Sequence, residues 1–225
     1  MMLARLLAMA VVLLSLLASA DAGAGPPTDQ LRGHVERVLK ILDDPALLSD
    51  GKAAERRATI RAIAGEIFDF EEISLRSLGR HWQARTTAER KEFVQLFGEL
   101  LERTYISRIE GYSGEKIAYV GEALDSDQAT VRTRIVTKQG TEVPVDYRML
   151  LRGDRWRAFD VTIEGVSLVG NYRTQFNSII QRASYPELVA KLRAKQDERT
   201  DEGATKRRER KVEASTGPAP RRQAP

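Results

Sequence analysis

The 225-residue sequence contains no cysteine and only two histidines, His34 and His81. Without cysteine, disulfides, thiolate metal sites and thiol nucleophiles are excluded, and two histidines are too few for a multi-histidine metal centre. The chain also lacks the Gly-x-Ser-x-Gly, Walker, His-Glu-x-x-His and dinucleotide-binding motifs. Isolated histidines are usually structural or exposed, and we interpret both in that way. The sequence therefore gives little indication of covalent catalysis or of a metal site.

The first twenty residues have almost no charge. Arg5 is the one charged side chain, and it precedes the apolar run Leu6–Leu17 and the small residues Ala18-Ser19-Ala20. This is the order of regions in a secretory signal peptide, and the run is shorter than the roughly 20 residues that span a bilayer. We predict that residues 1–20 are cleaved and that the protein is exported, in keeping with a bacterial periplasm. An uncleaved anchor helix is the alternative.

The formal net charge of +4 is unevenly distributed along the chain. Residues 191–225 hold 11 basic and 6 acidic side chains, whereas residues 21–190 hold 24 basic and 26 acidic ones. The slightly acidic body gives no reason to expect nucleic-acid binding. We predict a folded domain over residues 21–195 and a basic, solvated tail over residues 196–225. The tail either has no partner or docks on an anionic membrane.

Helical patterns come first in the body. Apolar residues recur at three- and four-residue spacing, and Thr28 or Asp29 is the expected cap of the first helix. Thr86 and Glu89 form a capping box at the start of the longest amphipathic segment. The expected helices are residues 28–42, 53–68, 71–78, 87–109, 168–182 and a last one that opens at Ser184.

Strand patterns follow after Gly111. Alternating apolar residues and short turns favour an antiparallel meander. Pro144 lacks an N–H donor, so its strand is an edge strand or begins near Pro144. The expected strands are residues 116–124, 128–137, 142–151 and 156–163. Helices followed by four strands and more helices predict an α+β domain with helices on one sheet face.

The residues leave two questions open. Large apolar side chains on these elements fit a filled core as well as a lined pocket, because periodicity does not distinguish the two. Asp160 and Glu164, at a strand end, could act as a base inside a cavity, but a carboxylate there more often pairs with an arginine such as Arg157 or Arg173. We expect such a pair.

One segment resembles a known family. Trp156 is followed by Phe159-Asp160-Val161, then by Glu164-Gly165-Val166-Ser167 and by a helix that contains Asn171-Tyr172-Arg173. This order is similar to the signature of the MlaC, or toluene-tolerance, family of periplasmic phospholipid-binding proteins. The segment from Phe93 to Tyr105 and the strand from Tyr147 to Leu150 also resemble that family, so the similarity covers about residues 30–192. The basic tail departs from the family pattern.

The resemblance implies an NTF2-like fold, in which a curved antiparallel sheet of about four strands packs against several helices and encloses an apolar pocket. It also implies a non-enzymatic phospholipid carrier between inner- and outer-membrane complexes, which maintains the lipid asymmetry of the outer membrane. Gly165 would allow the turn from strand to helix, and Ser167 would cap that helix. A hopanoid-related carrier and an enzyme with a cavity on the same fold are the alternatives.

The resemblance also implies partners and a site. The expected partners are phospholipid, an Mla-type ABC transporter complex in the inner membrane and a lipoprotein complex in the outer membrane, with transient membrane contact. We expect a monomer that has phospholipid as cargo and needs no cofactor or metal. The residues expected to line the pocket are Phe70, Ile73, Leu78, Phe93, Phe97, Tyr105, Tyr147, Met149, Phe159 and Val166.

Overall fold

The structure of the protein, a computed structural model, describes residues 25–196. The predicted signal peptide and, except for its first residue, the predicted tail lie outside the described residues. The expected α+β order is confirmed along the described part. Its elements are α2 (Pro26–Leu42), η1 (Asp50–Lys52), α3 (Ala53–Ile67), α4 (Phe70–Leu78), η2 (Gly79–His81), α5 (Thr87–Glu110), β1 (Lys116–Asp125), β2 (Gln128–Val136), β3 (Glu142–Arg152), β4 (Arg155–Ile163), β5 (Val166–Ser167) and α6 (Leu168–Arg182), followed by helical residues 185–196.

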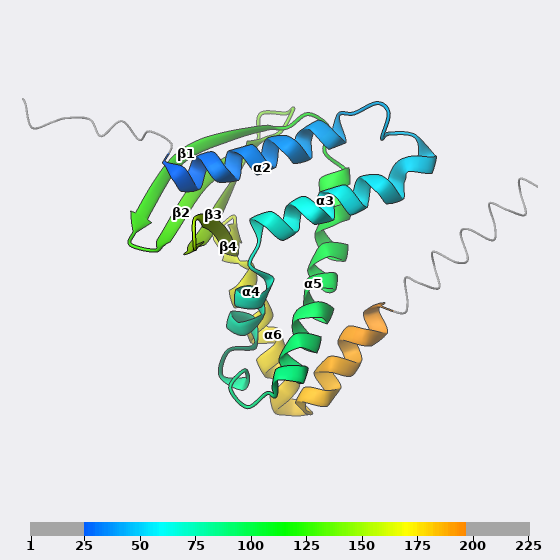
Figure 1. Ribbon diagram of the computed structural model, residues 1–225, viewed down its shortest axis with the longest axis vertical. Coiled ribbons are helices and arrows are strands. Elements are labelled where there is room, and N and C mark those ends of the chain that lie inside the picture. The colour runs from blue at the N-terminus through cyan, green and yellow to red at the C-terminus, as the bar shows by residue number, and fades with distance from the viewer. Residues whose placement is uncertain (1–24, 197–225) are drawn as a thin grey trace, which may run out of the picture.

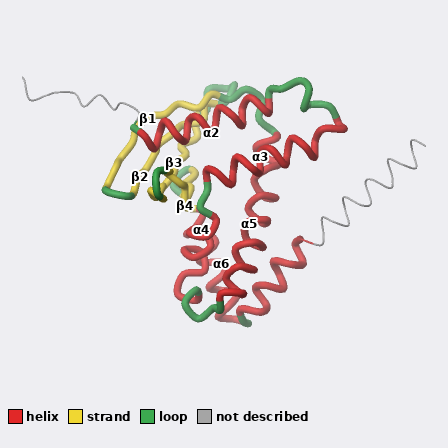
Figure 2. Tube along the Cα trace, viewed as in Figure 1, coloured by secondary structure: helices red, strands yellow, loops and turns green. Residues whose placement is uncertain are grey.

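The strands form one antiparallel sheet in the order β1-β2-β3-β4-β5, so the predicted meander is confirmed. Figure 2 shows the strands gathered at one end of the molecule, while helices make up the rest. The two-residue strand β5 has no counterpart among the four predicted strands. The pairing shifts near Tyr119 and Phe159 because each of these strands carries an additional residue there, and such bulges bend a sheet.

Pro144 lies near the start of β3, which is the second of the two positions that the sequence allowed. The strand runs between β2 and β4 and is therefore not an edge strand. Its pairing with β4 begins only at Val145, opposite Ile163, and the carbonyl of Pro144 accepts a hydrogen bond from the N–H of Glu164 at 3.0 Å. The missing N–H thus falls just outside the β3–β4 ladder.

Helix α2 begins earlier than the sequence pattern predicted. Gly25 precedes its first residue, and Pro26 and Pro27 occupy the first turn, where the absent N–H groups would have no helical partner. The expected cap Thr28 lies inside the helix, and its N–H and hydroxyl donate to Glu122 of β1 at 2.9 and 2.7 Å. A carboxylate distant in sequence therefore fixes this helix end on the sheet.

Local signals place the ends of two other helices correctly. Thr86 and Glu89 form the predicted capping box: the N–H of Thr86 donates to Glu89 at 2.7 Å, and the N–H of Glu89 donates to the Thr86 hydroxyl at 3.2 Å. Ser167 caps α6 by accepting from the N–H of Gly170 at 2.9 Å. Gly165 has a φ of 82°, which makes the sharp turn before α6 possible.

The helices form two groups (Figure 1). Helix α2 lies against the sheet, where it contacts β1, β2 and β4, and α3 packs against α2 and contacts β4. Helices α4, α5 and α6 and residues 185–196 form the second group, in which α4 packs on α5 and α6. The connection from α3 to α4 and the contact of α6 with β4 join the two groups.

Candidate functional site

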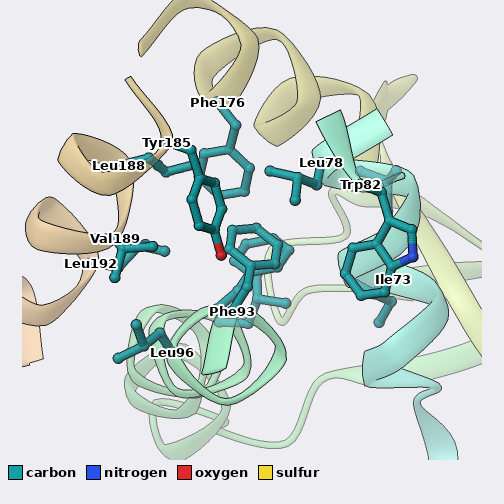
Figure 3. Packing of buried hydrophobic residues seen from close by; sticks show 13 residues of the cluster. Ile73, Leu78, Trp82, Phe93, Leu96, Phe176, Tyr185, Leu188, Val189 and Leu192 are labelled. Atoms are coloured by element: carbon teal, nitrogen blue, oxygen red, sulfur yellow. The ribbon is translucent and has the colours of Figure 1, made fainter. Parts of the chain in front are cut away.

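The second group of helices encloses a cluster of apolar side chains that we call the helical core (Figure 3). Its side chains come from α4, α5, α6, the last helical residues and Trp82, which directly follows η2, and each is at most 7% exposed. Partly buried residues such as Tyr105 and Tyr172 pack around it. The helical core consists of Ile73, Leu78, Trp82, Phe93, Leu96, Phe97, Leu101, Val169, Phe176, Tyr185, Leu188, Val189 and Leu192.

Aromatic rings fill the middle of the helical core. Phe93 and Phe97 have no exposed surface. The Phe97 ring centroid lies 4.9 Å from that of Tyr172 and 5.0 Å from that of Phe176, both in edge-to-face geometry. Phe93 meets Phe176 at 5.6 Å in the same geometry. Rings in such contact leave no room for a ligand between them, so this region is a packed core.

A second cluster lies between the sheet and helices α2 and α3, and we call it the sheet cluster. Several partly buried residues pack against it. They include Val35 and Val38 of α2 and Tyr119 and Tyr147 of the sheet. The sheet cluster consists of Leu31, Ile63, Ile67, Ala129, Val131, Met149, Trp156 and Ala158.

Two tyrosines of the sheet face the sheet cluster. Desolvation raises the pKa of the Tyr147 phenol to about 12, and no charge or hydrogen bond contributes to that shift. Desolvation, followed by the nearby Tyr147, also raises the pKa of Tyr119 to about 12. Tyr147 nevertheless keeps some accessible surface. Both phenols thus lie beside the apolar side chains of the sheet cluster and are only partly covered.

Phe68 touches both clusters and follows directly after α3. Its carbonyl accepts a hydrogen bond from Arg157 of β4 at 2.6 Å, and the same guanidinium nitrogen reaches the Gly65 carbonyl at 2.7 Å. The next residue, Asp69, donates its N–H to the Ala158 carbonyl at 2.9 Å. These bonds attach the junction of α3 and α4 to the sheet, so that one aromatic side chain connects the two apolar regions.

The structure does not bring the ten expected lining residues to one place. Ile73, Leu78, Phe93 and Phe97 lie in the helical core, with Phe70 and Tyr105 partly buried beside it. Met149 and Tyr147 belong to the sheet cluster and its neighbours.

Phe159 and Val166 lie outside both clusters. Phe159 is 1% exposed, and the guanidinium carbons of Arg76 and Arg148 lie 4.1 and 5.0 Å from its ring centroid. Val166 is 62% exposed. We therefore leave these two side chains out of the lining that we propose below.

Sequence reasoning did not include Tyr119 or Phe68 among the lining residues. Tyr119 had only a weak signal, because its neighbours Ala118 and Val120 are also apolar, and only the structure shows Tyr119 partly covered and Val120 exposed. The sequence marks Phe68 only as a large apolar side chain at the end of a predicted helix, which fits a core as well as a pocket. It stands at the end of α3, and its place between the clusters depends on where Arg157 holds that end.

Asp160 is 3% exposed, and its partners differ from those we expected. It accepts hydrogen bonds from the Ser167 hydroxyl at 2.6 Å and from the N–H of Val169 at 3.0 Å, and Arg148 lies 4.0 Å away. The expected pairing with Arg157 or Arg173 is wrong, because both arginines bind backbone carbonyls instead. With both oxygens engaged at the start of α6, Asp160 holds the helix on β4.

Arginines of α3 form ion pairs with glutamates of α5. Glu110 accepts from Arg57 at 2.9 Å and from Arg56 at 3.1 Å, and Arg61 pairs with Glu102. Burial disfavours the charge of Glu110, but the hydrogen bonds from the two arginines outweigh it and hold its pKa below the ordinary value. Polar contacts therefore connect α3 to the C-terminal part of α5.

The remaining titratable groups suggest no reaction centre. His34 lies 3.5 Å from Glu66, and the His81 ring contacts the Asn177 amide at 3.0 Å. Burial lowers the pKa of His34, which disfavours its charged form. Among residues 25–196, no group of three or more histidine and acidic side chains is placed to hold a metal ion. A search of the same residues finds no helix with the length and hydropathy of a membrane span.

Comparison with known families identifies the chain. A model described as MlaC protein matches residues 32–194. The chain belongs to the MlaC family. The match covers all of the helical core and all of the sheet cluster except Leu31, so both apolar regions are part of the MlaC domain. It also agrees with the span of about residues 30–192 that the sequence resemblance indicated.

Two relatives of the MlaC domain are informative. The intermembrane phospholipid transport system binding protein MlaC of Haemophilus influenzae is 23% identical over 158 residues, which cover 68% of this chain and 70% of that protein. The phospholipid-binding protein from Ralstonia solanacearum, solved in complex with a phospholipid, superposes with a TM-score of 0.66 at 24% identity. The superposition covers 77% of this chain and 98% of that one, and it establishes a common fold.

Proposed function

We propose that this protein is a periplasmic carrier that takes phospholipid between an inner-membrane ABC transporter complex and an outer-membrane lipoprotein complex. Membership of the MlaC family supports the proposal. So do the names of the relatives, one a binding protein of an intermembrane phospholipid transport system and the other a structure with a bound phospholipid. The predicted signal peptide supports the location.

The acyl chains lie against the sheet cluster. The observation that carries this assignment is the contrast between Tyr147, which keeps accessible surface beside the sheet cluster, and the rings of Phe93 and Phe97, which have none. Val35 and Val38 of α2, also partly buried, provide further apolar surface opposite the sheet. Phe68 extends that surface toward the helical core.

The energetics favour a carrier of this kind. Two acyl chains hold about 30 methylene groups, and each costs about 0.8 kcal/mol to expose to water, so a free lipid cannot cross an aqueous compartment at a useful rate. Transfer of the acyl chains from a bilayer to an apolar protein surface exchanges one water-free environment for another, so its free energy can be close to zero. Loading and release can then be controlled by partner complexes without a covalent step.

The engagement of Asp160 supports a non-enzymatic role. A general base needs a free oxygen near the substrate, but the oxygens of Asp160 already accept from Ser167 and Val169. Glu164 lies in an exposed turn with a φ of 50°. Neither carboxylate belongs to the sheet cluster against which we place the cargo.

Extraction of lipid from the exported protein tests the proposal. The full chain is expressed with its N-terminal segment, purified from the periplasm and analysed by native mass spectrometry. We expect stoichiometric phospholipid, and transfer of labelled phospholipid between vesicles when the protein is added. Consistently empty protein that transfers nothing between vesicles would contradict the carrier function.

A matched pair of variants locates the cargo. Val38→Trp adds bulk beside the sheet cluster, and Leu48→Trp adds the same group at a position that is 57% exposed. We expect bound lipid to fall in the first variant and to stay at the wild-type level in the second, with circular dichroism confirming that both are folded. Equal lipid content in the two folded variants would place the cargo elsewhere.

A further inference from the structure

The two tyrosines of the sheet cluster share one face of the sheet. Tyr119 of β1 stands opposite Thr133 of β2, and Tyr147 of β3 stands opposite Val131. Thr133 and Val131 are two residues apart on β2 and therefore point to the same side. This is the side that α2 covers, because the Arg32 guanidinium of α2 lies 4.7 Å from the centre of the Tyr119 ring. The two phenols thus point into the same space.

The hydroxyls of these tyrosines have no protein partner in the described part of the chain. The Tyr119 oxygen is buried without a hydrogen bond. Tyr147 is partly accessible, and none of the side-chain hydrogen bonds among residues 25–196 involves its hydroxyl. Thr133, on the same face, is satisfied, because its hydroxyl donates to the Val145 carbonyl at 2.7 Å. Buried polar groups are nearly always paired, so an unpaired phenol in a binding region indicates an acceptor on the ligand.

We propose that Tyr119 and Tyr147 donate hydrogen bonds to the ester carbonyl oxygens that join the acyl chains to glycerol, so that the carrier selects ester-linked lipids. The inference rests on the proposed carrier function and names the part of the cargo that this face recognises. It also accounts for the presence of two phenols, because a diacyl lipid carries two ester carbonyls.

The surroundings favour the esters over the other oxygens of a phospholipid. An ester carbonyl is uncharged and can be buried once a donor reaches it, whereas a phosphate needs a cation or water. Arg32 is the cation found beside the pair, and its side chain is 40% exposed, at the rim of the region. The phosphate therefore stays at the rim, and the methylene groups beyond the esters meet the apolar members of the sheet cluster.

A comparison of ester and ether lipids tests the proposal. The delipidated full chain is titrated with a diester phosphatidylethanolamine and with its diether analogue of the same chains, which keeps the phosphate but lacks both carbonyls. We expect the wild type to bind the diester about tenfold more tightly. In the double variant Tyr119→Phe with Tyr147→Phe, this preference should fall to within about twofold, with each single variant between these values.

The controls separate the inference from the function on which it depends. Phe keeps the ring, and Tyr185→Phe removes a phenol that donates to the Glu89 carbonyl in the helical core, so that variant should keep the full preference. Equal affinity of the wild type for the two lipids would overturn the proposal, and so would an equal loss of both in the double variant, which would assign the phenols to the phosphate. A wild type that binds neither lipid would contradict the carrier function itself.

Discussion

The helical core and the sheet cluster are built from the same kinds of side chain but differ in how completely those side chains are covered. Phe93 and Phe97 have no exposed surface, and both rings contact Phe176 edge to face. Tyr119 and Tyr147 are only partly covered, and neither hydroxyl has a hydrogen-bond partner among residues 25–196. The difference separates apolar residues that hold the fold together from those against which we propose that the cargo lies. Amino-acid type alone does not make that distinction.

Truncation of one ring in each region gives the largest expected effect. Phe93→Ala leaves a cavity among packed rings and should lower the free energy of unfolding by about 3–5 kcal/mol. Tyr147→Ala removes a ring that already borders open surface and should cost less, about 1–3 kcal/mol. Urea denaturation of the lipid-free proteins measures both. If the two costs are equal, the sheet cluster is as closely packed as the helical core and the comparison fails.

The hydrogen bonds of Asp160 attach α6, which contributes to the helical core, to β4 of the sheet. Asp160→Ala leaves the Ser167 hydroxyl and the N–H of Val169 without their acceptor, and we expect a loss of about 2–3 kcal/mol in stability, measured by thermal and urea unfolding. The exposed Glu36→Ala is the matched control and should change stability by less than about 0.5 kcal/mol. A comparable loss of stability in both variants would show that the hydrogen bonds of Asp160 between β4 and α6 do not stabilise the fold more than an exposed carboxylate does.

Alkaline pH distinguishes the buried phenol of the sheet cluster. The pKa of Tyr147 is about 12 in the folded protein, and an unfolded phenol has a pKa near 10. A raised folded pKa contributes stability below the unfolded pKa that is lost as the pH rises toward the folded one, because the unfolded chain ionises first. Between pH 9 and 11 this loss is about 1.4 kcal/mol. Urea unfolding of Tyr147→Phe should show a correspondingly smaller fall than the wild type, and identical curves would contradict the assignment.

The smallest expected effect concerns the ion pairs between α3 and α5. Glu110→Gln removes the carboxylate that two arginines share and should destabilise the protein by about 1 kcal/mol. Because the folded pKa of Glu110 is lowered, its contribution is present above the unfolded pKa and is lost as the pH falls through the folded one. The difference in stability between wild type and Glu110→Gln should therefore disappear at acidic pH. Glu142→Gln, in an exposed pair with Arg134, should have almost no effect at any pH in the same unfolding series.

Much of the fold could be predicted where the signals are local. The Thr86–Glu89 capping box and the Ser167 cap each depend on residues within one helical turn, and both predictions are confirmed. The start of α2 was misplaced because its hydrogen bonds go to Glu122, 94 residues away. The partners of Asp160 were also predicted wrongly, since proximity in sequence to Arg157 says nothing about the direction in which that side chain points from the strand.

The sequence by itself determined the order of helices and strands, the antiparallel meander and the family, since periodicity, turn residues and the Trp156–Val169 segment are all local properties. Only the tertiary structure decided which of these side chains are fully packed, as Phe93 and Phe97 are, and which stay partly covered, as Tyr147 does. That distinction depends on whether a side chain on one element meets another across the fold, as Phe97 meets Tyr172 and Phe176, or lacks a partner there, as the hydroxyl of Tyr119 does in the described part of the chain. Periodicity shows which face a residue occupies, but packing alone determines what lies opposite that face.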